Sequence, residues 1–259
     1  MRLLFIGDAV ASAGRRIIES RVPALRDELE LDFVVANGEN LADGVGITSR
    51  VARRVLAAGV DVITLGNHAL RHSEVYPFLD SEPRIIRPAN LSDRAPGRGL
   101  TVCNGHGGSK LAVVNLMGSL FLEPARSPFA VAQQLVAEAR EQTPLVLVDF
   151  HAEATSEKVA MGRFLDGSAT AVVGTHTHVQ TSDARILPGG TAYITDAGMT
   201  GPHDSVIGVR ADLVLRRFTT GIPVRFEPAE GDVRLEGILI DFNPDGKATA
   251  AESVRIAEG

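Results

Sequence analysis

The chain has one cysteine (Cys103), no tryptophan and two tyrosines among its 259 residues. A single cysteine excludes an intrachain disulfide framework and a zinc site built from paired cysteines. Long apolar runs are also missing. The N-terminal run Leu3–Ile6 ends at Gly7-Asp8 and is too short for a signal peptide, and no stretch approaches the roughly 20 apolar residues of a membrane span. These absences predict a cytoplasmic protein that does not enter a membrane.

Positive charge is scarce as well. The sequence has 26 Lys and Arg residues against 32 Asp and Glu residues, a formal net charge of −6 at pH 7. Because a non-specific nucleic-acid coat needs a basic face, this balance predicts no extended nucleic-acid surface. An anionic substrate would therefore need a local source of positive charge. Hydrophobic residues make up 44% and charged residues 22%, as in folded globular chains.

Short runs of β-forming residues recur through the first 200 residues, and most of them end at Gly, Asn, Asp or His. We predict buried strands at Leu3–Ile6, Phe33–Ala36, Val62–Leu65, Leu111–Leu116, Leu145–Phe150, Ala171–Val173 and Ala192–Thr195. Helical patterns lie between several of these runs, at Arg15–Leu29, Ser49–Ala58, Pro128–Arg140 and Thr155–Leu165. Strands that alternate with helices indicate an α/β fold with a largely parallel sheet.

The pattern changes after about residue 205. Further strands with little helix between them are predicted at Val209–Phe218, Val224–Glu227, Val233–Asp241 and Ala248–Ile256. The segment Asn243-Pro244-Asp245-Gly246 is typical of a turn between the last two. We expect this part to be antiparallel and packed against the α/β part. Because no linker, repeat or low-complexity segment is present, we expect residues 1–259 to form a single domain.

Polar side chains follow six of the predicted strands, at the point where each strand ends. In open α/β sheets, ligands bind outside the carboxyl ends of the strands, so these side chains are expected along one edge of the sheet. The segments concerned are Asp8, Asn37–Asn40, Gly66–His68, His151, Gly174–His178 and Asp196.

Taken one at a time, most of these residues have an ordinary structural explanation. Asp8 could cap a helix near Gly14, and Glu39 and Asn40 could be turn residues. The segment His176-Thr177-His178 is more specific, because in an extended segment both imidazoles project on the same face. Two imidazoles beside Asp and Glu suit a divalent transition metal such as Mn, Fe or Zn.

The number of ligand-type side chains points to two ions, because it exceeds what one ion needs once water or substrate is added. The candidates are Asp8, Glu39, Asn40, Asn67, His151, His176 and His178. Two ions about 3.5–4 Å apart need a bridging carboxylate, and such pairs act on in-line displacement at phosphorus. His68 directly follows Asn67, and an imidazole at the rim of the site could protonate a leaving alkoxide.

These motifs resemble those of the calcineurin-like metallophosphoesterases. The longer stretches Asn37–Thr48, Val148–Lys158 and Gly174–Pro202 more closely resemble the bacterial YmdB-type 2′,3′-cyclic-nucleotide 2′-phosphodiesterases, and the similarity covers nearly the whole chain. The resemblance implies an α-β-β-α fold, a two-sheet β-sandwich flanked by helices. One departure is that the subfamily usually continues Thr-Trp-Asp after Asn67-His68, whereas this chain has Ala69-Leu70-Arg71.

The resemblance also implies a dinuclear site in which Glu39 bridges the two ions. The first ion would be held by Asp8, Glu39, Asn40 and His178, and the second by Glu39, Asn67, His151 and His176. Fe or Mn is expected, with Zn or Mg as alternatives. A hydroxide held between the metals would attack phosphorus, and His68 would protonate the departing 2′-oxygen to give a 3′-nucleotide. Two divalent ions would add about four positive charges locally, so the acidic net charge does not count against a small phosphodiester substrate.

Two other functions stay open. The same metal pair would support a broader phosphatase or phosphodiesterase acting on phosphoproteins, phosphomonoesters or 3′,5′-cyclic nucleotides. A regulatory protein that binds a nucleotide through an inherited site is the other alternative, although the complete ligand set argues against it. The expected partner is thus a small phosphodiester, and the sequence leaves homo-oligomer formation open.

Overall fold

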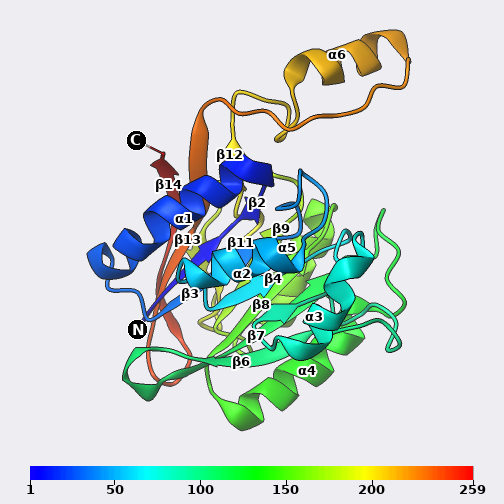
Figure 1. Ribbon diagram of the computed structural model, residues 1–259. Helices are drawn as coiled ribbons and strands as arrows, with labels where there is room; N and C mark the ends of the chain where they lie inside the picture. The colour runs from blue at the N-terminus through cyan, green and yellow to red at the C-terminus, as the bar shows by residue number, and fades with distance from the viewer. Residues whose placement is uncertain (259) are drawn as a thin grey trace.

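The computed structural model of the chain describes residues 1–258, and Gly259 lies outside the described part. Two β-sheets pack face to face, and helices cover their outer faces (Figure 1). This arrangement confirms the predicted α/β fold with an α-β-β-α sandwich. No helix within residues 1–258 combines the length and the apolar character needed to cross a membrane.

The first sheet has the strand order β2-β12-β13-β1-β3-β4-β5, and β14 pairs with β13. Its parallel part comprises β1 (Arg2–Ile6), β3 (Phe33–Asn37), β4 (Val62–Thr64) and β5 (Ile85–Ile86). Two long antiparallel strands extend it beyond β1, namely β13 (Val233–Phe242) and β14 (Ala248–Ala257). A short parallel pair completes it, formed by β2 (Asp8–Ala9) and β12 (Met199–Pro202).

The second sheet has the strand order β10-β11-β9-β8-β7-β6. Its four central strands are parallel, namely β7 (Lys110–Met117), β8 (Val146–His151), β9 (Ala171–Thr175) and β11 (Ala192–Ile194). The edge strands are antiparallel to their neighbours, namely β6 (Leu100–Asn104) and β10 (Arg185–Ile186). The predicted strands of the first 200 residues are therefore confirmed.

The alternation of side chains along β1 divides the core into layers. Leu3 and Phe5 pack between the two sheets, whereas Leu4 and Ile6 pack on the helix side of the first sheet. That side is covered by α1 (Ala11–Glu28), α2 (Ser49–Ala57) and α3 (Tyr76–Ser81). The outer face of the second sheet is covered by α4 (Pro128–Gln142) and α5 (Thr155–Phe164). Two short 3-10 helices lie at Ser73–Val75 and His106–Gly108.

Two predictions for the C-terminal part are wrong. Val209–Phe218 is not a strand, because helix α6 occupies Ala211–Thr220, and Val224–Glu227 lies outside the strands. The Val, Leu and Phe residues of this run are β-formers, but Asp212 in the first turn, Arg217 in the last turn and Gly221 as a left-handed C-terminal residue are helix signals. With its flanking segments, α6 forms an arm (residues 205–230) that stands out from the body in Figure 1.

Candidate metal centre

The carboxyl ends of the strands bring all eight predicted site residues together at one edge of the sandwich. Asp8 begins β2 and is separated from β1 by Gly7 alone, and His151 is the last residue of β8. The others lie in the segments that follow β3, β4 and β9. Asp8 is not a helix cap, because α1 begins after Val10.

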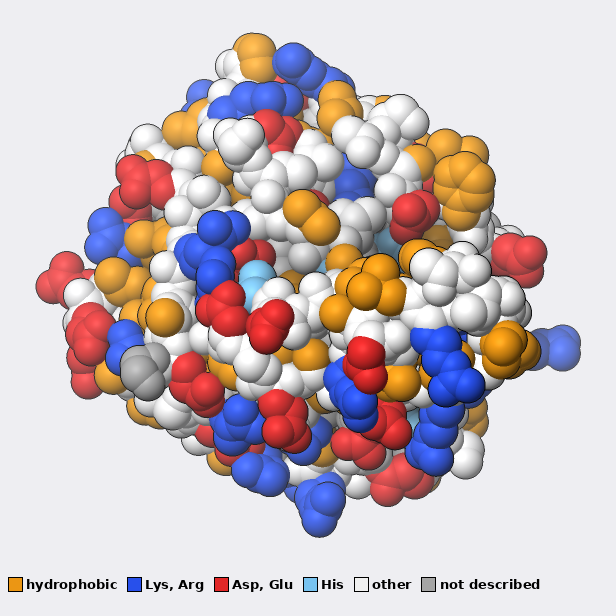
Figure 2. All heavy atoms as spheres, turned by 90° about the horizontal axis from the view of Figure 1, so that it is seen from above, with side chains coloured by type: hydrophobic (Ala, Val, Ile, Leu, Met, Phe, Trp, Pro, Cys, Tyr) orange, Lys and Arg blue, Asp and Glu red, His pale blue; other side chains and the backbone are white. Residues whose placement is uncertain are grey.

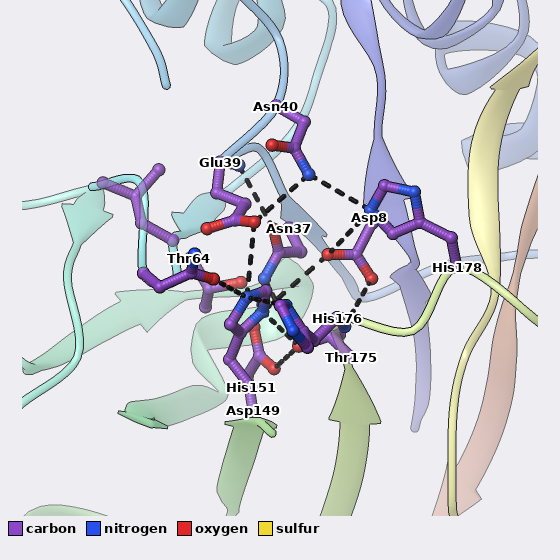
Figure 3. A network of polar contacts seen from close by, with 12 residues as sticks. Asp8, Asn37, Glu39, Asn40, Thr64, Asp149, His151, Thr175, His176 and His178 are labelled. Atoms are coloured by element: carbon purple, nitrogen blue, oxygen red, sulfur yellow. Dashed lines mark hydrogen bonds and ion pairs between the residues drawn. The ribbon is translucent and has the colours of Figure 1, made fainter. Parts of the chain in front are cut away.

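One group of ligand atoms surrounds a common point. Single ligand atoms of Glu39, His151 and His176 all lie within 4.8 Å of one another, and their side chains converge in Figure 3. His151 Nε2 lies 3.3 Å from Glu39 Oε1 and 3.0 Å from His176 Nδ1. Asn67 Oδ1 lies 3.0 Å from the same His151 nitrogen. A carboxylate, two imidazoles and an amide oxygen could hold one transition-metal ion here.

A second group shares Glu39 with the first. Asn40 Nδ2 lies 3.1 Å from both Glu39 Oε1 and His178 Nε2. His178 Nε2 lies 3.9 Å from Oδ1 of Asp8, which is fully buried. Among the described residues, Asp8 Oδ1 has no hydrogen-bond partner, although Oδ2 accepts a hydrogen bond from His176 N at 2.9 Å. A buried carboxylate oxygen without a partner is costly, so this group fits a bound cation.

The close approach of His151 and Glu39 to the backbone requires glycine at position 66. A Cβ on Gly66 would collide with His151 Nε2 and Glu39 Oε2. Gly66 therefore leaves room for the side chains of His151 and Glu39 in the first group.

Burial and neighbouring charges oppose one another in these groups. Burial raises the pKa of Asp8, with His178 and His151 acting against it. Burial also favours a higher pKa for Glu39. The charge of His151 and hydrogen bonds from His151 and His68 outweigh it and hold this pKa well below the ordinary value. Burial lowers the pKa of His151, yet Glu39 and Asp8 raise it to about 9. Burial and the charge of His151 lower the pKa of His176 to about 3.

The two histidines after β9 lie at the site, but their backbone conformation differs from the extended one that the sequence predicts. The segment is not extended, because φ is 99° at His176 and 61° at His178. Such backbone conformations are costly for residues other than glycine, and surrounding contacts have to hold them. Asp196 supplies these contacts, because its Oδ2 accepts hydrogen bonds from Thr177 N at 3.1 Å and Thr177 Oγ1 at 2.6 Å.

The sequence motifs assign no role to the residues that support the predicted ligands, although Asn37 and Thr175 lie in the predicted segments. Thr175 Oγ1 donates to Asp149 Oδ1 at 2.7 Å and lies 3.0 Å from His151 Nδ1. Asn37 Nδ2 donates to Asp149 Oδ2 at 3.0 Å, and burial raises the pKa of Asp149 to about 6. The spacing in β8 is the available signal, because Asp149 and His151 are two residues apart and share a face. Glu153, with Oε2 3.0 Å from His176 Nε2, was also unidentified.

A cavity of about 340 Å³ opens beside both groups. Glu39, Asn40, His68, His176 and His178 line its inner end. The His68 side chain is 37% exposed, so a ligand in the cavity can reach it. Figure 2 looks onto this edge from above and shows histidine side chains in a hollow between hydrophobic and acidic ones.

Asp196 is itself held by a buried ion pair, whose loss should destabilise the fold. Lys158 Nζ lies 2.7 Å from Asp196 Oδ2, and both side chains are almost fully buried. We expect Lys158→Met to lower the free energy of unfolding by about 3–5 kcal/mol, because it leaves a buried charge uncompensated. Arg54→Met removes an exposed ion pair with Glu19 and should cost less than about 1 kcal/mol. Equal losses in urea unfolding would contradict this assignment.

A described protein family and a curated relative match the chain over most of its length. A model of the family described as YmdB-like protein matches residues 4–254. The chain is 49% identical over 247 residues to the 2′,3′-cyclic-nucleotide 2′-phosphodiesterase of Bacillus subtilis (strain 168), covering 95% of this chain and 93% of the relative.

Solved structures are similar over the whole chain. A hypothetical protein of Thermus thermophilus has a TM-score of 0.93 and 44% identity, with both chains covered completely. A phosphatase of Mycoplasma pneumoniae has a TM-score of 0.92 and 34% identity, with 99% of this chain and 93% of the other covered. With the family match over residues 4–254, these similarities show that the chain belongs to the YmdB-like proteins.

Proposed function

We propose that this chain is a metal-dependent phosphodiesterase that hydrolyses 2′,3′-cyclic nucleotides to 3′-nucleotides. The observation that carries the proposal is the position of Glu39, a buried carboxylate shared by two groups of ligand-type side chains at the end of an open cavity. The substrate class comes from the name of the Bacillus subtilis relative, which is 49% identical.

The proposed ligands divide as the two groups do. Asp8, Glu39, Asn40 and His178 would hold one ion, and Glu39, Asn67, His151 and His176 would hold the other. When bound, two divalent ions supply activation of water near neutral pH and neutralise charge that develops at phosphorus. The mixture of imidazole, carboxylate and amide ligands suits Fe or Mn.

His68 is the proposed proton donor, and its neighbours fix which ring nitrogen acts. His68 Nδ1 lies 3.2 Å from Asn40 Oδ1 and 3.4 Å from Glu39 Oε1. Both oxygens are acceptors, so they favour a proton on Nδ1 and hold the ring at the cavity wall. The remaining nitrogen, Nε2, is then the one that can donate to a bound substrate.

The proposed reaction breaks one bond to phosphorus and forms another. The oxygen of water forms a bond to phosphorus, and the bond between phosphorus and the 2′-oxygen breaks. His68 gives its Nε2 proton to the 2′-oxygen, and the proton lost by water returns the imidazole to its acid form. The product is a 3′-phosphomonoester with a free 2′-hydroxyl group.

A matrix of metals and substrates tests the proposal. Protein reconstituted with Mn²⁺ or Fe²⁺ is assayed with 2′,3′-cyclic AMP, 3′,5′-cyclic AMP and a phosphomonoester. We expect the highest kcat/KM for 2′,3′-cyclic AMP, with 3′-AMP as the product. A higher kcat/KM for the phosphomonoester would identify a phosphatase instead. Nucleotide binding without turnover under every metal would identify a regulatory binding protein.

A further inference from the structure

The cavity has a second, apolar end that the metal centre does not use. We infer that this end is a seat for the nucleobase of the substrate, with Phe218 and Phe226 of the arm as stacking surfaces. The inference rests on the proposed function and adds the part of the substrate that the phosphodiester chemistry leaves undefined.

The apolar end continues directly from the metal centre. Ile207, Phe218, Phe226 and Pro228 of the arm line it, together with Val45 from the loop between β3 and α2. His178 connects the two ends, because its Nδ1 lies 3.1 Å from the backbone oxygen of Ile207 in the arm. A molecule whose phosphate reaches His68 and His178 would therefore extend its other end along the arm. A total volume of about 340 Å³ is in the range of small-molecule sites.

Core packing does not explain the aromatic residues of the arm. Val214 of α6 is buried, and it also lines the cavity. Phe218 is 77% exposed and Phe226 is 41% exposed, although both line the cavity. Large apolar side chains that gather on the surface beside a hollow are typical of a binding site.

The chemistry of this end suits a flat aromatic group. The Arg217 guanidinium carbon lies 5.4 Å from the centroid of the Phe226 ring, which steadies that ring by a cation–π contact. Every nucleobase has a π-face, so stacking on phenylalanine tolerates all four bases. The nearby Glu227 carboxylate already accepts a hydrogen bond from Arg210 Nη1 at 2.8 Å, which leaves it less available to read a base edge. We therefore expect little preference among the bases.

Comparing substrates with and without a base tests the seat. Phe218→Ala and Phe226→Ala are assayed, in the metal-loaded protein, with 2′,3′-cyclic AMP and with methyl ribofuranoside 2′,3′-cyclic phosphate, which has no base. Each variant should lower kcat/KM for 2′,3′-cyclic AMP by about tenfold, mainly through KM, as expected for loss of base stacking. The base-free substrate should change by less than about twofold, and Phe226→Tyr should restore KM.

A matched control and the opposing outcomes keep the test decisive. Phe164→Ala removes a half-exposed phenylalanine that does not line this cavity, and it should leave both substrates unaffected. Equal losses on both substrates would overturn the seat, as would a change in sedimentation mass without a change in KM, which would assign the arm to contact with a second copy. If the unmodified protein hydrolyses both substrates with equal kcat/KM, the seat alone fails. If it hydrolyses neither, the proposed function fails and the seat with it.

Discussion

Replacing His68 by alanine should lower kcat for 2′,3′-cyclic AMP by about 10²–10⁴-fold, the contribution of a positioned general acid. The bound metals should remain, because His68 is not among the proposed ligands. The imidazole is held against Asn40 and Glu39 at the cavity wall and is partly open to a ligand. The measurement is steady-state kcat together with the metal content of the purified variant.

The leaving group of the substrate gives this prediction a second readout. A diester with a p-nitrophenolate leaving group needs little protonation, so His68→Ala should impair its hydrolysis much less than that of 2′,3′-cyclic AMP. His203→Gln is the matched control, since His203 contacts Glu236 and does not line the cavity. Equal impairment of both substrates, or turnover close to that of the unmodified protein, would remove His68 from the acid role.

Replacing Glu39 by glutamine should abolish metal binding and lower kcat/KM by more than about 10³-fold, since metal ions supply several kcal/mol of transition-state stabilisation. Glutamine keeps the shape of the side chain but removes the charge that both groups share. The Glu39 side chain is 1% exposed, so solvent cannot replace that charge. Metal content per chain and kcat/KM are the measurements.

Thermal unfolding separates loss of metal from loss of fold in this variant. An ion that binds the folded state but not the unfolded state raises the free energy of unfolding by about 2.7 kcal/mol when its free concentration is 100 times Kd. Mn²⁺ should therefore raise the Tm of the unmodified protein and leave that of Glu39→Gln unchanged. Glu82→Gln, a substitution at a surface ion pair with Arg84, should retain the Mn²⁺ response. A Glu39→Gln variant that keeps both ions would contradict the shared role.

The sequence predicts the central strands of both sheets and the residues at their ends, because both follow from local patterns. The apolar run of β1 and the polar Asp8 after it are adjacent in sequence, so no tertiary information is needed to place them. We also propose that the chain is a single domain, since the C-terminal strand β13 pairs with β1 and completes its sheet.

The rest depends on contacts that join distant parts of the chain. Asp149 and Asn37 are 112 residues apart, and Lys158 and Asp196 are 38 apart, so neither pair is visible as a motif. The sequence predicts a strand where helix α6 lies, because its β-forming residues outweigh the helix signals at its ends, Asp212 and Gly221. The histidines at 176 and 178 adopt left-handed backbone conformations that only the surrounding hydrogen bonds explain.

Anomalous X-ray diffraction from crystals of the Mn²⁺-loaded protein tests the dinuclear centre directly. We expect two manganese peaks per chain about 3.5–4 Å apart, both within bonding distance of the Glu39 carboxylate. One peak should also lie against Asp8, and the other against His151. No peak at this edge of the sandwich, or a single peak out of contact with Glu39, would contradict the dinuclear centre.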